Sequence, residues 1–458
     1  MTSWGRELAR AWGRLGPRFL PFADVATPDL PLSRLLRLSL FQLSVGMALV
    51  LLVGTLNRVM IVELGVPTSL VALMVALPIV FAPIRALIGF RSDHFRSALG
   101  WRRVPFIWKG SLYQFGGFAI MPFALLVLAG QGQAAAAPAW IGLLAAAAAF
   151  LLVGAGLHMV QTVGLALATD LTAEASRPRV VGFMYVMLLL GMLVSALVFG
   201  HLLEHYSHGR LIQVIQGAAV LTLVFNVVAI WKQEPRQFKR PSVDLNEEPS
   251  FAEAWKSFSQ QPGAQRWLLI IGLGTMAFTM EDVLLEPYGG EMLGLSVSAT
   301  TLLTATLAFG SLIGFGMAAQ LLSRGGDAGR LSAMGLVLGV PAFFLVILAA
   351  PFASGFWFSS GVFLIGLGAG LFGHGTLTTM MGEAVSGQSG LALGAWGAVQ
   401  ATAAGFGMAI GGVLKDLMAQ FVPAGFAYSF VYGLEILLLF AALGVAVPLL
   451  RFRKSMIA

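Results

Sequence analysis

The chain has 458 residues, of which 58% are hydrophobic and only 11% are charged, and its mean hydropathy is +0.85. Soluble domains carry about 25% charged residues, so a chain this apolar cannot cover itself with a wetted surface and must be solvated by lipid. It contains no cysteine, which excludes disulfides, thiolate metal sites and cysteine nucleophiles. A net charge of +7 in such a chain reflects membrane topology and does not indicate binding to nucleic acid.

The N-terminal segment, residues 1–34, predicts an amphipathic cytoplasmic segment and not a signal peptide. Trp4, Leu8, Trp12 and Leu15 recur at helical spacing, and arginines fall on the opposite face. A helix of this kind lies in the headgroup plane of a membrane. Its role is either an interfacial anchor or a docking surface for a partner protein.

Twelve apolar stretches of the ~20 residues that cross a bilayer follow in two sets of six. The first set makes an N-terminal half over residues 35–231, and the second makes a C-terminal half over residues 267–450. The stretches lie near 36–57, 68–90, 104–129, 139–168, 182–203, 211–231, 267–288, 297–322, 331–350, 355–378, 391–414 and 426–449. The sequence therefore predicts an all-α membrane protein with about twelve transmembrane helices.

Polar segments separate and follow the two halves. Residues 232–266 predict a cytoplasmic linker, in which Ser250 and Glu253 have the spacing of a capping box at the start of an interfacial helix. Residues 451–458 predict a cytoplasmic tail. Lysine and arginine gather on one side of the predicted topology, whereas the other side holds only Arg58, Arg210 and Lys415. Both termini are therefore expected in the cytoplasm.

The two halves repeat each other. Gly154–Leu157, followed by His158, recurs as Gly368–Leu371, with His374 close behind. Six plus six spans with a long middle loop is the layout of the major facilitator superfamily.

The loop between the second and third spans adds a second sign of this superfamily. Gly89 and Asp93, followed by Arg102 and Arg103, resemble its cytoplasmic gate motif. Glycine lets two helices approach closely, and the aspartate accepts hydrogen bonds from helix N-termini or from arginine.

Five stretches of the chain are distinctive beyond this general layout. They are Arg37–Met47, Gly54–Gly65, Arg85–Asp93, Gly100–Pro105 and Leu285–Gly290. Together they resemble the PucC/LhaA family of light-harvesting complex assembly proteins of purple phototrophic bacteria. The resemblance implies an assembly factor in the bacterial inner membrane, either cytoplasmic or intracytoplasmic. Its implied partners are antenna polypeptides and bacteriochlorophyll or the machinery that makes it, with bacteriochlorophyll as bound cargo.

Two other classes of function compete with assembly. An enzyme that prenylates pigment would need aspartates spaced to share magnesium, and no two aspartates here have that spacing, so the chain is not expected to be an enzyme. A secondary transporter of a small solute is the alternative, because Glu281 and Asp282 fall at depth in the seventh span.

The charged residues inside the spans also allow a structural interpretation. Under the internal repeat, Arg58 in the first span corresponds to Asp282 in the seventh. Arg58, Glu281 and Asp282 are therefore predicted to make a charge contact between the halves. The competing interpretation is that Arg58 extends to the lipid headgroups.

His158 and His374 are the predicted pigment-binding residues. Neutral imidazole is suited to ligate the magnesium of a bacteriochlorophyll, and a histidine in hydrocarbon needs some partner. The alternative is that each histidine bonds a neighbouring carbonyl or hydroxyl group and ties spans together. No catalytic residue and no resident metal site are expected.

The predicted topology is tested with a reporter fused after Leu245. The reporter is expected to be active in the cytoplasm, because the linker carries six lysine and arginine residues. Alkaline phosphatase activity at this position, which requires the periplasm, would disprove the topology.

Overall fold

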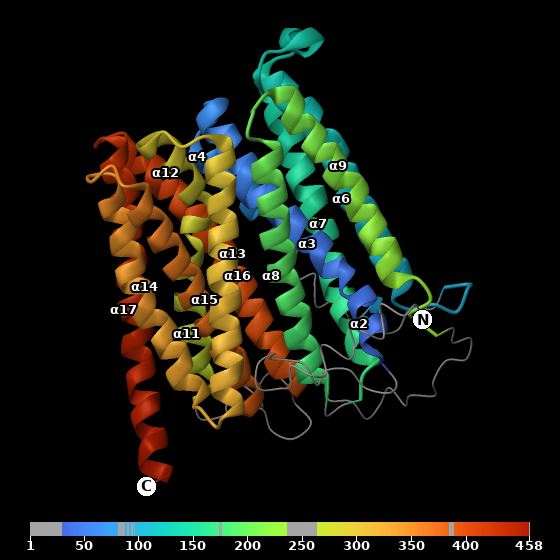
Figure 1. Cartoon of the computed structure of the whole chain (residues 1–458), viewed down its shortest axis with the longest axis vertical. Coiled ribbons are helices and arrows are strands. Elements are labelled where there is room, and N and C mark those ends of the chain that lie inside the picture. Colours follow the sequence, from blue (N-terminus) through green and yellow to red (C-terminus); the bar gives the residue numbers. More distant parts are fainter. Residues whose placement is uncertain are drawn as a thin grey trace. The chain divides into compact units, whose positions relative to one another are not determined.

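The computed structural model describes residues 30–80, 88, 91–92, 95, 97–173, 176–235, 263–383 and 389–457. Every regular element in these ranges is a helix, as Figure 1 shows. The predicted amphipathic helix near the N-terminus, the interfacial helix of the linker, Gly89 and Asp93 lie outside the described residues.

Ten of the described helices are long and apolar enough to cross a membrane. The number is eleven if the bent pair Ala264–Val283 and Leu285–Leu293 forms one span. The predicted second span is described as helix from Thr68 only to Val80, which is too short to be counted. The prediction of an all-α, multi-pass membrane protein is confirmed.

The chain divides into two compact units. Unit 1 contains residues 1–52 and 83–238, and unit 2 contains residues 53–82 and 239–458. The division differs from the two predicted halves because the segment from Val53 to Ala82 groups with the C-terminal helices. The first span is thus divided between the units along its length.

Unit 1 is held together by packed helices and a buried polar chain. Its helices are α2 (Leu32–Leu38), α3 (Leu40–Leu49), α6 (Val104–Leu128), α7 (Ala139–Asp170), α8 (Arg177–Leu202) and α9 (His208–Ile230). α6 packs on α7 and α9, and α3 packs on α8. The Ser44 hydroxyl donates to Asn226 Oδ1 at 2.7 Å, and Asn226 Nδ2 donates to Gln114 Oε1 at 3.1 Å. These buried bonds join α3, α9 and α6 where lipid offers polar groups no partner.

Unit 2 begins at Val53, inside the second part of the first span, which is wound as π-helix over Val50–Leu56 and Val59–Glu63. The later elements are α4 (Thr68–Ala76), η3 (Leu77–Val80), α11 (Ala264–Thr279), η6 (Glu281–Val283), α12 (Leu285–Leu293), α13 (Val297–Ser323), α14 (Ala328–Ala349), α15 (Gly355–Glu383), α16 (Ser389–Ala419) and α17 (Ala424–Ile457). The last helix extends through most of the predicted tail.

Helices α13 and α15 approach each other through glycines. A Cβ atom at Gly310, Gly314 or Gly370 would lie within 2.9–3.1 Å of a backbone nitrogen of the other helix, and a Cβ at Gly366 would meet the carbonyl oxygen of Leu307. Small residues are common at such contacts because helix association in lipid depends on close van der Waals packing.

We predict that Gly366→Ala destabilises the protein by about 1–3 kcal/mol, because the new methyl group overlaps backbone that cannot move aside. Gly373→Ala, in the same helix, is the matched control, since a Cβ there meets nothing within 4 Å. The control should be neutral or gain up to ~1 kcal/mol from helix propensity. Thermal unfolding in detergent measures both variants, and equal midpoints would contradict the packing account.

Candidate functional site

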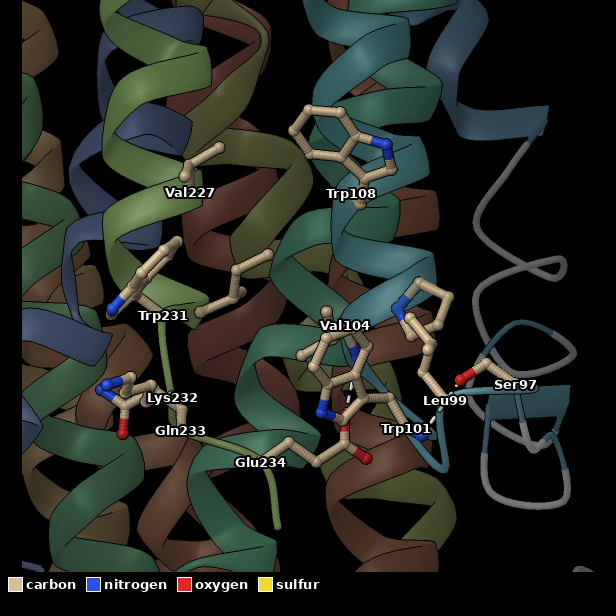
Figure 2. A pocket seen from close by; sticks show the side chains of 12 residues that line it. Ser97, Leu99, Trp101, Val104, Trp108, Val227, Trp231, Lys232, Gln233 and Glu234 are labelled. Carbon is tan, nitrogen blue, oxygen red and sulfur yellow. Dashed lines mark hydrogen bonds between the residues drawn. The ribbon is translucent and has the colours of Figure 1, made fainter. Parts of the chain in front are cut away.

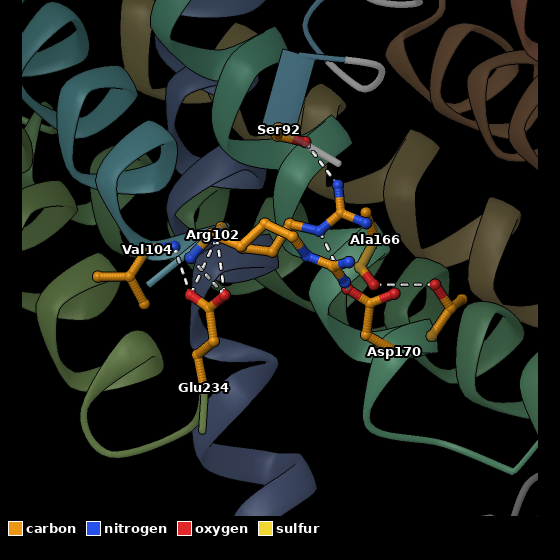
Figure 3. A network of polar contacts seen from close by, with 8 residues as sticks. Ser92, Arg102, Val104, Ala166, Asp170 and Glu234 are labelled. Atoms are coloured by element: carbon orange, nitrogen blue, oxygen red, sulfur yellow. Dashed lines mark hydrogen bonds and ion pairs between the residues drawn. The ribbon is translucent and has the colours of Figure 1, made fainter. Parts of the chain in front are cut away.

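A carboxylate from the end of one helix caps the start of another in unit 1. Glu234, four residues beyond α9, accepts from the backbone N–H groups of Arg102, Arg103 and Val104 at 2.7–2.9 Å (Figure 3). The first N–H groups of a helix lack intrahelical partners, and a negative charge there is favoured by the helix dipole. Glu234 therefore fixes the start of α6 to the end of α9.

The two arginines of the predicted gate motif join the same network. Arg103 Nε donates to Asp170 Oδ2 at 3.0 Å, and its Nη1 donates to the Ser92 hydroxyl at 2.5 Å. The Arg102 side chain also pairs with Asp170, at the end of α7. Among the described residues, Asp170 accepts from both arginines, and Figure 3 shows the group together.

An apolar cavity of about 740 Å³ adjoins this network. It is lined by residues of two stretches, 97–108 and 227–234, which belong to the start of α6 and the end of α9. Figure 2 shows Trp108 and Trp231 among its walls, with Glu234 at one end. Its volume lies within the range of small-molecule sites in proteins.

Unit 2 contains carboxylates buried inside the bundle. Glu281, Glu286 and Glu435 are at most 3% exposed. Within the part of the chain that the structure describes, Glu281 Oε2 and both carboxylate oxygens of Glu435 have no hydrogen-bond partner, nor does the hydroxyl of Tyr432. Buried acids in a membrane span are expensive, so such groups mark candidate binding sites for a proton or a cation.

Arg58 is buried in unit 2 and does not extend to the headgroups. It is 4% exposed, pairs with Glu63, and donates through Nη2 to the carbonyl oxygen of Leu295 at 3.1 Å. Its neighbour Asn57 donates to the carbonyl oxygen of Val283 at 3.0 Å.

The first span thus contacts the segment that follows Glu281 and Asp282. The ion pair of Arg58 is nevertheless with Glu63, five residues along its own span. A charge contact of Arg58 with Glu281 and Asp282 stays a prediction.

A second cation, Lys415, joins α16 to α4. Its ammonium donates to the Thr68 hydroxyl at 3.0 Å and lies 3.7 Å from Glu291 Oε2. Asp416 accepts from the backbone N–H of Ser69 at 2.6 Å. These bonds hold the start of α4 against the C-terminal helices, which explains why residues 53–82 group with unit 2.

The two predicted pigment ligands lie inside helices. His158 is half-buried in α7, and His374 in α15 is 9% exposed with its ring centroid 4.2 Å from that of Phe315. A Cβ at Gly156 would lie 2.7 Å from the Gln114 nitrogen, and one at Gly370 would lie 2.9 Å from the Phe315 nitrogen.

These two glycines therefore serve helix packing, and among the glycines beside the histidines only Gly373 borders open space. The Phe315 ring packs against the ring of His374. Ligation by either histidine stays a prediction.

Sequence reasoning missed three features of these sites. Glu234 lies 130 residues from Val104, one of the amides that its carboxylate caps, so no local pattern connects them. The cavity arises from the same long-range pairing. Glu435 could have been identified from the sequence, because an acidic residue in an apolar span is itself unusual.

Comparison with known proteins identifies the family. The family model described as PUCC protein matches residues 55–454. Protein PucC of Rhodovulum sulfidophilum is 62% identical over 404 residues, which are 88% of this chain and 89% of that protein. Protein PucC of Rhodobacter capsulatus is 57% identical over 447 residues, 96% of each chain. The bacteriochlorophyll synthase 44.5 kDa chain of Rhodobacter capsulatus is 30% identical and covers 92% of this chain and 96% of its own length.

Solved structures show the fold. A bacterial homologue of the iron transporter ferroportin in its inward-facing state matches with a TM-score of 0.65 at 14% identity, over 90% of this chain and 97% of that one. A mutant of the nucleoside transporter NupG matches with a TM-score of 0.64 at 15% identity, over 90% of this chain and 99% of that one. The predicted major facilitator superfamily-like architecture is confirmed, and the sequence match over residues 55–454 shows that this chain belongs to the PucC protein family.

Proposed function

We propose that this chain is an assembly factor for photosynthetic light-harvesting antenna complexes. It handles or delivers bacteriochlorophyll, antenna polypeptides or both within the inner membrane of a phototrophic bacterium, with both termini in the cytoplasm. The observation that carries this proposal is the family membership over residues 55–454, together with relatives at 57–62% identity. A relative at 30% identity has a name that refers to bacteriochlorophyll synthesis.

The cavity of unit 1 supports a binding role. A site that handles pigment or an apolar polypeptide needs apolar surface at membrane depth, and unit 1 has a cavity of about 740 Å³ with mostly apolar walls. The described aspartates do not combine with other acids or histidines into a group that could hold a metal ion.

We predict that deletion of the gene in its phototrophic host lowers the level of at least one antenna complex, while the enzymes of pigment synthesis stay active. Absorption spectra of isolated membranes measure the antenna, and pigment intermediates extracted from the same cells measure synthesis. A plasmid copy of the gene should restore the antenna. Normal antenna spectra in the deletion strain would refute the proposal.

Transport of a small solute is the second candidate. The specific observation in its favour is that Glu281 Oε2 and both carboxylate oxygens of Glu435 are buried without a hydrogen-bond partner among the described residues, within a fold shared with transporters. A carrier of this fold alternates between two forms, and it must then release the first and second spans from the C-terminal helices. An assembly factor can keep the contacts of Arg58 and Lys415 permanently.

We predict that locking this contact leaves antenna assembly intact. The Cγ2 atom of Val62 lies 3.3 Å from where a Cβ on Gly290 would be, so Val62→Cys with Gly290→Cys is the pair chosen for a disulfide crosslink. The native chain has no other cysteine to interfere. Antenna spectra should be the same in cells with the crosslinked and the reduced variant. If crosslinking abolishes assembly and reductant restores it, the first span must move relative to the C-terminal helices. That result would favour transport over a permanently closed assembly factor.

A further inference from the structure

Tryptophan side chains gather in the walls of the unit 1 cavity. Three of the ten tryptophans in the chain, Trp101, Trp108 and Trp231, line it. Trp108 is 42% exposed and Trp231 is 59% exposed, although α6 and α9 otherwise turn mainly aliphatic side chains outward. Figure 2 shows Trp108 above and Trp231 to the side of the space between the two helices.

Tryptophans are common at membrane interfaces, where their rings lie at headgroup level. That preference explains indoles at the ends of α6 and α9. It does not explain why three of them surround one concavity large enough for a ligand. Flat aromatic walls are suited to a flat ligand, because ring systems gain contact by stacking on one another or meeting edge to face.

At the polar end of the cavity, Lys232 is the charged side chain without a partner among the described residues. Both oxygens of Glu234 are occupied by backbone N–H groups of α6. Gln233 is occupied by Arg34, through bonds of 2.9 Å and 3.2 Å. Lys232 is exposed and has no hydrogen-bond or ion-pair partner among the residues that the structure describes.

Lys232 has a backbone conformation that is unfavourable for lysine. Its φ of 51° is one of two positive values at non-glycine residues in the described ranges. Lysine rarely adopts this conformation, and it persists only where surrounding contacts hold it. Here the turn brings Glu234 onto the start of α6, and Lys232 is among the residues that line the cavity.

We propose that this cavity is a binding site for a tetrapyrrole pigment. The ring lies against Trp108 and Trp231, and Lys232 donates to an oxygen acceptor on the ring edge. The inference rests on the proposed function and deepens it, because it names the substrate class and its site. It is independent of His158 and His374. A macrocycle has the flat face that the indoles match, whereas a lipid chain would need only aliphatic walls.

The test uses full-length protein purified in detergent from a host that makes no pigment. Bacteriochlorophyll is titrated into it, and the shift of the pigment absorption band measures binding. The double variant Trp108→Ala with Trp231→Ala should raise the dissociation constant about tenfold or more, which corresponds to the loss of two ring contacts. Lys232→Gln should raise it about threefold.

Two variants separate a lost site from lost folding. Trp140→Ala removes an indole of similar exposure, 61%, that does not line the cavity, and it should bind like the wild type. Trp108→Phe with Trp231→Phe keeps aromatic rings and should recover most of the affinity. A gel-filtration profile equal to that of the wild type shows that each variant is folded.

Three results would overturn the site. One is equal affinity of the double alanine variant and the wild type, and another is no pigment binding by the wild type. The third is displacement of the pigment by excess phospholipid with equal loss in all variants, which would make the cavity a lipid groove. These binding results do not depend on the deletion strain. The assembly function is therefore tested separately, by the antenna spectra of that strain.

Discussion

Hydrocarbon offers no hydrogen bond to a polar group, and this constraint governs how both units are built. Backbone groups are satisfied inside helices, and the groups left over at helix ends or on polar side chains must find protein partners. In unit 1, Glu234 satisfies the first amides of α6, and the Ser44–Asn226–Gln114 chain joins three helices. Since apolar side chains gain nothing over lipid, close glycine contacts such as those of α13 and α15 supply the remaining attraction.

The same constraint explains which part of the chain belongs to unit 2. Arg58 and Lys415 are cations that the predicted topology places near one face of the membrane, and both are almost fully buried in the structure. Arg58 is compensated by Glu63 of its own span and by the carbonyl oxygen of Leu295, and Lys415 is compensated by Thr68 and Glu291. Losing one partner would leave a buried charge, so these contacts bind residues 53–82 firmly to the C-terminal helices.

The chemistry of the two units differs in a way that bears on function. Unit 1 carries the capping network of Glu234 and, beside it, the cavity lined by indoles. Unit 2 carries buried acids without partners in the described residues, of which Glu435 is fully buried. Membership of the PucC family favours pigment or polypeptide handling as the use of this fold. The buried acids of unit 2 support solute transport as the alternative function.

The sequence by itself determined the class, the spans and the family. Composition excluded a soluble chain, and apolar runs of bilayer length located the helices, because both depend only on local residue content. The stretches that resemble the PucC family are local as well. Tertiary structure alone decided what Arg58, Lys415 and Glu234 bind, since their partners lie up to 347 residues away in sequence. It also decided the cavity, which exists only because α6 and α9 meet, and it showed that Gly156 and Gly370 serve helix packing beside the two histidines. Local pattern specifies which segments enter the membrane, whereas the choice of partner for each buried charge depends on how those segments pack.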